Sequence, residues 1–134
     1  RRGRSGLAEA YASRTDESFH EWRKRAKDLR YQVGLLEPVW PSIMEDFEKT
    51  LHKLTDRLGD DHDLADLRSF IRASPRLTTG ADGFTPLIEE IDRRRSELQA
   101  KARPLGARIY PEKGRAFSRR VEKYWDAWRM RPWT

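Results

Sequence analysis

Cationic side chains recur at helical spacing between residues 20 and 31 of the chain. At about 100° per residue, one face of a helix there collects six residues able to contact an anion. They are His20, Arg23, Lys24, Lys27, Arg30 and Tyr31. Arginine offers forked donors, lysine a compact charge, and histidine and tyrosine add hydrogen bonds. We call these six residues the cationic stripe, and their chemistry indicates an anion-binding surface.

The concentration of charge in the cationic stripe needs a compensating partner. Like charges four residues apart destabilise a helix by about 0.2–0.5 kcal/mol per pair. Either acidic residues of neighbouring helices or an extended polyanion has to offset that cost. Charge runs are usually solvated surface, here paired with the acidic middle of the chain. We favour anion binding, because a histidine and a tyrosine share the face and thirteen further Lys or Arg follow residue 92.

The other face of the same helix is apolar, which predicts that it packs on a core. Its apolar residues are Phe19, Trp22, Ala26, Leu29, Val33 and Leu36, while Glu21 and Asp28 lie on a flank between the two faces. The stretch from Thr15 to Ser18 supplies N-cap candidates. The helix is therefore predicted to run from there to about Leu36.

A second helix is predicted to follow two prolines, with Ser42 as its N-cap and Glu45 completing a capping box. Apolar spacing continues to about Ile71, either as one long helix deformed near Gly59 or as two helices. Residues 74–82 are rich in Gly, Pro, Ser and Thr, which is typical of a loop.

Two more amphipathic helices are predicted in the last third of the chain. Thr85 is the expected N-cap of the first, and Pro104 inside it is expected to produce a kink. A turn at residues 110–114 precedes the last helix. Its apolar residues are Phe117, Val121, Tyr124, Trp125 and Trp128. We expect most of the five tryptophans to lie in the core.

The N-terminal 18 residues are expected to be a short or partly mobile segment. Residues 7–12 can form a short helix, and Arg1, Arg2 and Arg4 are interpreted as a mobile arm. Residues 19–134 supply four helices with one apolar face each. The sequence thus predicts an all-α single domain over residues 1–134, folded as a four-helix antiparallel bundle with long helices.

Composition narrows the class of protein. The chain has 134 residues, no cysteine, and equal apolar and charged fractions of 37%. Disulfides and thiolate metal sites are therefore excluded. No apolar run approaches the roughly 20 residues of a membrane span, and no signal peptide is visible. From these signs we expect a cytoplasmic location. The first residue is not Met, so the chain is interpreted as a candidate fragment of a longer protein.

Charge is distributed unevenly along the chain. Residues 1–36 carry nine Lys or Arg and five Asp or Glu, residues 37–92 carry six and thirteen, and residues 93–134 carry thirteen and four. Both ends are basic and the middle is acidic. If the two ends meet in the fold, they form one strongly positive surface.

Three motifs, taken in order, resemble the CHAD family, the conserved histidine α-helical domains. The first is the cationic stripe. The second is the stretch Leu58-Gly59-Asp60-Asp61-His62-Asp63, and the third is Phe117-x-x-Arg120-x-x-x-Tyr124-Trp125-x-x-Trp128. Together they cover most of the chain after residue 18. The resemblance implies binding of inorganic polyphosphate by the stripe. No enzymatic activity is expected, because the chain has no cysteine, no Ser-His-Asp order typical of a catalytic triad and no Gly-rich phosphate loop.

The resemblance also implies an architecture and partners. CHAD domains consist of two similar helical halves, and this chain resembles the C-terminal half alone. We expect either a missing N-terminal half or a homodimer that rebuilds the two-lobed shape. A triphosphate tunnel enzyme domain elsewhere in the full protein and a location at polyphosphate granules are further implications. No cofactor and no membrane partner are expected.

Other basic residues are candidates to extend the site, and other functions remain alternatives. The candidate extension comprises His62, Arg94, Lys101, Arg108, Arg119, Arg120 and Lys123. One alternative is a helical protein that binds nucleic acid without sequence preference, which would also be sensitive to salt. A weaker alternative is a phosphohydrolase acting on polyphosphate, with His20 or His62 as acid and base.

A metal site is not favoured by the three histidines and the nearby aspartates. The spacing of His20, His52 and His62 matches no common metal motif, and the aspartates do not match an EF-hand. We interpret residues 60–63 as a structural polar element, which either satisfies a helix end or orients basic side chains.

Overall fold

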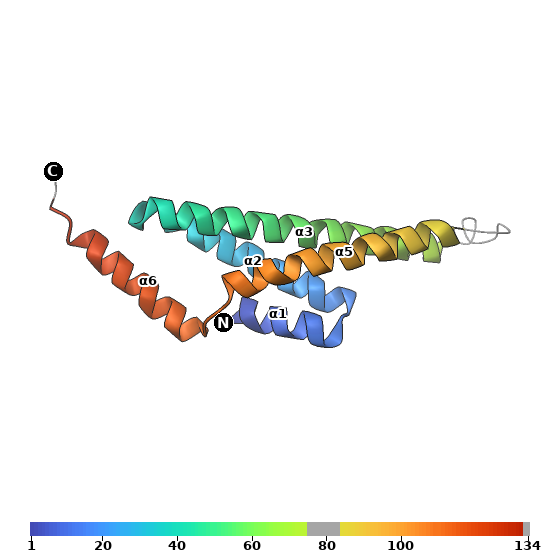
Figure 1. Cartoon of the computed structure of the whole chain (residues 1–134), viewed down its shortest axis with the longest axis horizontal. Helices are drawn as coiled ribbons and strands as arrows, with labels where there is room; N and C mark the ends of the chain where they lie inside the picture. The colour runs from blue at the N-terminus through green and yellow to red at the C-terminus, as the bar shows by residue number, and fades with distance from the viewer. Residues whose placement is uncertain (75–83, 133–134) are drawn as a thin grey trace.

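The computed structural model describes residues 1–74 and 84–132, and this part of the chain is helical without strands. The helices are α1 (Arg2–Ser13), α2 (Asp16–Leu35), α3 (Pro41–Ala73), α5 (Thr85–Ile109) and α6 (Gly114–Arg129), with a 3-10 turn, η1 (Glu37–Val39), between α2 and α3 (Figure 1). The all-α prediction is therefore confirmed. The loop predicted at 74–82 lies almost wholly outside the described residues.

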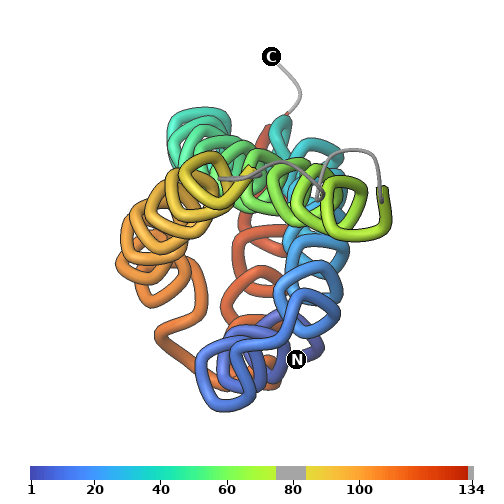
Figure 2. The backbone as a smooth tube through the Cα atoms, turned by 90° about the vertical axis from the view of Figure 1, so that its right-hand side faces the viewer, coloured from blue at the N-terminus to red at the C-terminus, as the bar shows by residue number. Residues whose placement is uncertain are grey.

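Four of these helices, α1, α2, α3 and α5, surround one core (Figure 2). Helices α2 and α3 run in opposite directions, because α2 contacts α3 through His20 and His62 at its start and through Arg30 and Glu48 near its end. Tyr11 of α1 donates a hydrogen bond to the carbonyl oxygen of Gln99 in α5 at 2.6 Å.

Helix α1 is longer than the short helix expected over residues 7–12. It begins at Arg2, and its Gly3 and Ala10 are buried. The ring of Tyr11 meets the edge of Trp22 at 5.7 Å, centroid to centroid. The sequence did not predict the first turn of α1, because α1 buries glycine and alanine, which carry little hydrophobic signal.

Helix α2 has the predicted boundaries and the predicted buried face. Thr15 and Ser18 form a reciprocal capping box. The indole of Trp22 is completely buried, and a Cβ atom at Gly106 would lie 2.6 Å from that ring. Only glycine therefore lets α5 close over the indole, and this contact helps fix α2 against α5.

Helix α3 runs without a break through Gly59, so the single-helix alternative is correct. Two helix starts differ from prediction. Trp40, not Ser42, occupies the N-cap position of α3, and Phe84, not Thr85, that of α5. In both cases a proline stands in the first turn, where its fixed φ favours starting the helix one or two residues earlier. Helix α5 continues past Pro104 to Ile109.

Helix α6 leaves the other helices at an angle (Figure 1) and has no buried residue. Phe117 stacks on Phe47 at 5.9 Å, and Tyr124 meets Trp40 at 4.9 Å. The side chains of Trp40 and Trp125 are 42% and 43% exposed, while Trp133 lies outside the described residues. The expectation that most tryptophans lie in the core is therefore wrong, because α6 covers only one end of the core.

Candidate functional site

The cationic stripe lies along the line where α2 packs on α3. His20 faces His62, Arg23 faces Gly59, and further along Arg30 approaches Glu48. Because the two helices are antiparallel, residue numbers rise along α2 while the numbers of the facing residues in α3 fall. The candidate site thus lies between two helices, although the six stripe residues all belong to α2.

His20 and His62 form the best-defined contact of the site. Their rings stack with centroids 4.1 Å apart and planes 17° apart. The pKa of His20 is lowered, because burial disfavours its charged form and because His62, Lys24 and Arg23 add positive potential. His20 Nδ1 is buried without a hydrogen-bond partner among residues 1–74 and 84–132, while His62 Nε2 lies 3.4 Å from Asp66 Oδ2.

Arg23 lies against α3 with an unsatisfied donor. Its Nε atom is buried and has no hydrogen-bond partner in the described part of the chain. A Cβ atom at Gly59 would lie 3.5 Å from that nitrogen, at ordinary contact distance. A longer side chain at position 59 would need the space that the guanidinium occupies. Gly59 therefore gives Arg23 its position beside the two imidazoles.

The rest of the stripe is weakly compensated by acidic residues. Lys24 lies 3.6 Å from Glu21, and Arg30 lies 4.0 Å from Glu48, both in exposed or half-exposed positions. Lys27 has no ion pair within the described ranges. Tyr31 is 66% exposed at the end of the stripe. Exposed ion pairs contribute about 0–1 kcal/mol each, so the face keeps most of its capacity to bind an anion.

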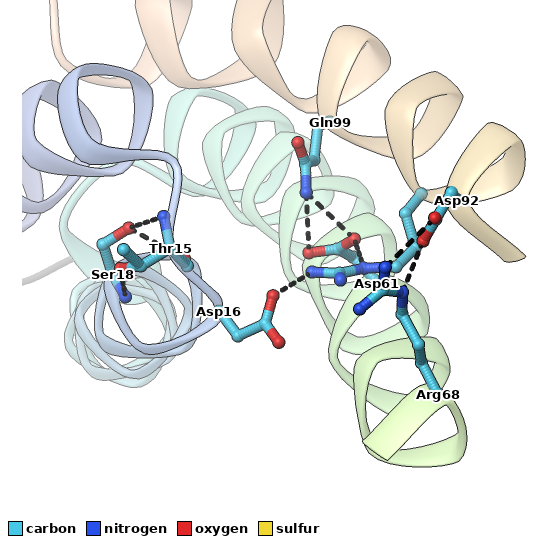
Figure 3. Close-up of polar contacts among 8 residues, drawn as sticks. Thr15, Asp16, Ser18, Asp61, Arg68, Asp92 and Gln99 are labelled. Atoms are coloured by element: carbon cyan, nitrogen blue, oxygen red, sulfur yellow. Dashed lines mark hydrogen bonds and ion pairs between the residues drawn. The ribbon is translucent and has the colours of Figure 1, made fainter. Parts of the chain in front are cut away.

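Asp61, next to His62, fixes the helices behind the site (Figure 3). Its carboxylate is 2% exposed and accepts hydrogen bonds from Arg95 Nε at 2.9 Å and from Gln99 Nε2 at 3.2 Å. Arg95 Nη2 also donates to Asp16 at 2.7 Å. One arginine thus ties α5 to α3 and to the start of α2. The interpretation of this motif as a structural polar element that orients basic side chains fits Asp61; Asp61 lies within α3 and satisfies no helix end.

Of the candidate extension, only His62 contacts the stripe. Arg94 pairs with Glu97 at 3.4 Å, and Arg120 with Glu112 at 2.5 Å. The four others are exposed and have no ion pair among the described residues: Lys101, Arg108, Arg119 and Lys123. No contact joins these α5 and α6 residues to α2, so their part in the site stays a prediction.

Two further results concern metals and membranes. Within residues 1–74 and 84–132, no group of three or more His, Asp and Glu side chains could hold a metal ion. His52 Nε2 instead lies 3.3 Å from Asp56 Oδ2, as His62 does from Asp66. None of the described helices combines the length and low charge that crossing a membrane requires.

A second group of cations was not singled out from the sequence. Arg1 and Arg4 line a hollow of about 920 Å³ together with Lys113 and Arg115. The two basic ends of the chain therefore do meet, as the charge distribution suggested for a fold that brings them together. The sequence alone could not identify these four residues, because the position of α1 against α6 depends on close approach at glycines such as Gly114.

Comparison with known families agrees with this geometry. A family model described as the CHAD domain matches residues 1–72, which is more than half of the chain and includes both the stripe and the Leu58–Asp63 motif. The chain therefore belongs to the CHAD domain family. No curated protein and no solved structure matches it.

Proposed function

We propose that this chain is a polyphosphate-binding module whose ligand lies along the cationic stripe between α2 and α3. The observation that carries the proposal is the junction of His20, Arg23 and His62. It holds two buried nitrogen atoms, His20 Nδ1 and Arg23 Nε, that lack a partner in the described residues. Buried polar atoms are normally hydrogen-bonded, so this junction is suited to an oxygen acceptor from outside.

The shape of the stripe suits a flexible phosphate chain. Residues 20–31 span about 16 Å of helix at 1.5 Å per residue. Cations recur along this length without aromatic platforms between them, so backbone phosphates can be contacted without bases. Each phosphate contact releases counterions, which makes such binding strong and salt-dependent. Membership of the CHAD family supports polyphosphate as the polyanion.

The proposal extends to the architecture of the full protein. Residues 1–134 would form one domain corresponding to one half of a two-lobed CHAD domain. The incomplete burial of α6, with Trp125 exposed, supports a further lobe, either a missing N-terminal half or a second copy of the chain. The role would be to target or organise polyphosphate granules in the cytoplasm, with a triphosphate tunnel enzyme domain as a candidate neighbour in the same protein.

A titration with long-chain polyphosphate tests this function directly. The purified chain is titrated at near-physiological salt, with single-stranded RNA as competitor. We expect tight binding that RNA does not displace, and no release of phosphate when a divalent metal is added. Failure to bind polyphosphate would refute the proposal.

A nucleic-acid-binding function is a second candidate, favoured by one observation. Trp125 and Trp128 lie 5.2 Å apart on α6, and Trp125 is exposed beside basic residues. Exposed aromatic rings beside cations are typical of surfaces that stack single-stranded bases. This candidate would be favoured if RNA of equal total charge displaced polyphosphate and if Trp125→Ala abolished that displacement.

A further inference from the structure

The hollow between α1 and α6 is the most positively charged feature outside the cationic stripe. Four cations line it: Arg1, Arg4, Lys113 and Arg115. None of the four makes an ion pair or a side-chain hydrogen bond within the described residues. The other polar side chains of the lining are Ser5 and Ser118, and no described acidic side chain lines it. Four unpaired cations around one hollow repel each other unless an anion enters.

A helix N-terminus lies at the same place. Helix α6 begins at Gly114 and has no side-chain N-cap and no acidic residue in its first turn. A Cβ atom at Gly114 would lie 2.8 Å from the backbone nitrogen of Arg1, so glycine allows the start of α6 to approach that residue. The positive end of the α6 dipole therefore adds to the four cations.

A buried hydroxyl group, that of Tyr110, packs against Gly3 of α1 near this hollow. A smaller hollow of about 180 Å³ shares Arg1, Arg4, Gly114 and Ser118 with the first and is also lined by Tyr110. The Tyr110 hydroxyl is buried and has no hydrogen-bond partner among the described residues. Glu112, which lines this smaller hollow, is already paired with Arg120.

We infer that the α1–α6 hollow is a second anion-binding site, separate from the stripe, that takes a short run of condensed phosphate. The larger hollow is roomier than one phosphate group, and its four cations match a multiply charged anion. No aromatic side chain lines it, so it offers no stacking surface for a nucleotide base. None of the six stripe residues lines this hollow.

The condensed phosphate has two sources that share this chemistry: a free anion such as tripolyphosphate, or a segment of a long chain that also contacts the stripe. Tripolyphosphate is the probe for calorimetry and for amide chemical shifts of the whole chain. We expect shifts centred on Gly114 and Arg115. The variant Arg4→Glu/Arg115→Glu should weaken tripolyphosphate binding by about tenfold or more. Glutamate in a first helical turn suits the dipole, so this variant should keep its fold.

The matched control is Arg72→Glu/Arg129→Glu, which changes net charge equally on exposed residues elsewhere. Unchanged tripolyphosphate binding in the control, together with amide shifts at Gly114 and Arg115 that persist in Arg23→Glu/Lys27→Glu, supports a separate site. Equal losses of tripolyphosphate binding in the control, or a loss only in the stripe variant, would overturn the proposal.

The source of the ligand is tested with long-chain polyphosphate. Weaker long-chain binding in Arg4→Glu/Arg115→Glu assigns the ligand to a chain segment, and unchanged long-chain binding assigns it to a free anion. Long-chain binding that does not depend on the stripe would instead refute the proposed function alone.

Discussion

His20 of α2 and His62 of α3 stack face to face at 4.1 Å, forty-two positions apart in the chain. The ring of His62 adds positive potential at His20, which disfavours the charged form of His20 and lowers its pKa. The pair also lies beside Arg23 and Lys24, with Asp66 as the nearby acidic group. The contact therefore links proton uptake to whatever anion approaches the rings.

We predict that affinity for polyphosphate rises as the pH falls from 8 to about 5.5. The bound anion favours the charged imidazole, so binding raises the lowered pKa of His20 and takes up protons. Titration calorimetry in two buffers of different ionisation enthalpy measures this uptake. His20→Gln should remove most of the change with pH, and an equally steep profile in that variant would contradict the assignment to His20.

Without ligand, the same histidine should make the fold less stable in acid. Its pKa is lower in the folded than in the unfolded chain, so the unfolded chain binds more protons. Stability should therefore be complete above about pH 6.5 and decline as the pH falls through that value, the ordinary pKa of histidine. Urea unfolding from pH 8 to 5 checks this, with His20→Gln as the variant expected to lose less stability.

The triple variant Arg23→Glu, Lys24→Glu, Lys27→Glu should abolish polyphosphate binding while the helical circular dichroism stays intact. Even milder replacement by Gln should lower the slope of log affinity against log salt by about two, since each lost contact releases about 0.7 fewer counterions. Lys49, Lys53 and Arg72, changed together to Glu, provide a control with the same change in charge on exposed α3 residues. Similar affinity losses in both triples would mean that only net charge matters.

Two substitutions of Gly59 are expected to have similar effects on the stability of the fold and different effects on ligand binding. Gly59 lies inside α3, so Gly59→Ala should stabilise the fold by about 0.5–1 kcal/mol, and its methyl group would only touch Arg23. Gly59→Leu should also favour the helix but displace the guanidinium and weaken polyphosphate binding. Thermal unfolding and titration of both variants test this. Equal affinities for the two would show that Arg23 does not depend on Gly59.

Asp61→Ala should destabilise the fold strongly, by about 3 kcal/mol, because it leaves the poorly exposed Arg95 without its main partner. Asp63→Ala, an exposed neighbour, should cost little. Denaturant unfolding measures both. A loss below about 1 kcal/mol for Asp61→Ala would place the link between α3 and α5 elsewhere, for example at Arg68 and Asp92.

Periodicity predicted α2 and its buried face correctly, because large apolar residues such as Trp22 and Phe19 mark one side of that helix. The same signal marks α6, yet α6 is mostly uncovered. An amphipathic pattern shows that a helix has an apolar face and not what lies against it. Gly3, Ala10 and Gly106 make close contacts that hydrophobicity does not register, which is why the sequence predicts only residues 7–12 of α1 as helix.

The candidate site was predictable on α2 and much less so on α3. Spacing alone identifies the six stripe residues, while the place of His62 was suggested by family resemblance. Gly59 is visible in the sequence, but its role beside Arg23 requires the register between two helices. Arg1, Arg4, Lys113 and Arg115 are far apart in the chain, so only the fold could group them.

Adjacent residues of α3 serve different neighbours: Asp61 holds Arg95 of α5, and His62 stacks on His20 of α2. The alignment of the proposed ligand face is therefore set from behind by α5, a helix that carries none of the six stripe residues. An excised α2–α3 hairpin would retain every residue of the stripe and lose this alignment. Any transplant of the site into another scaffold would have to carry Arg95 and Gln99 with it.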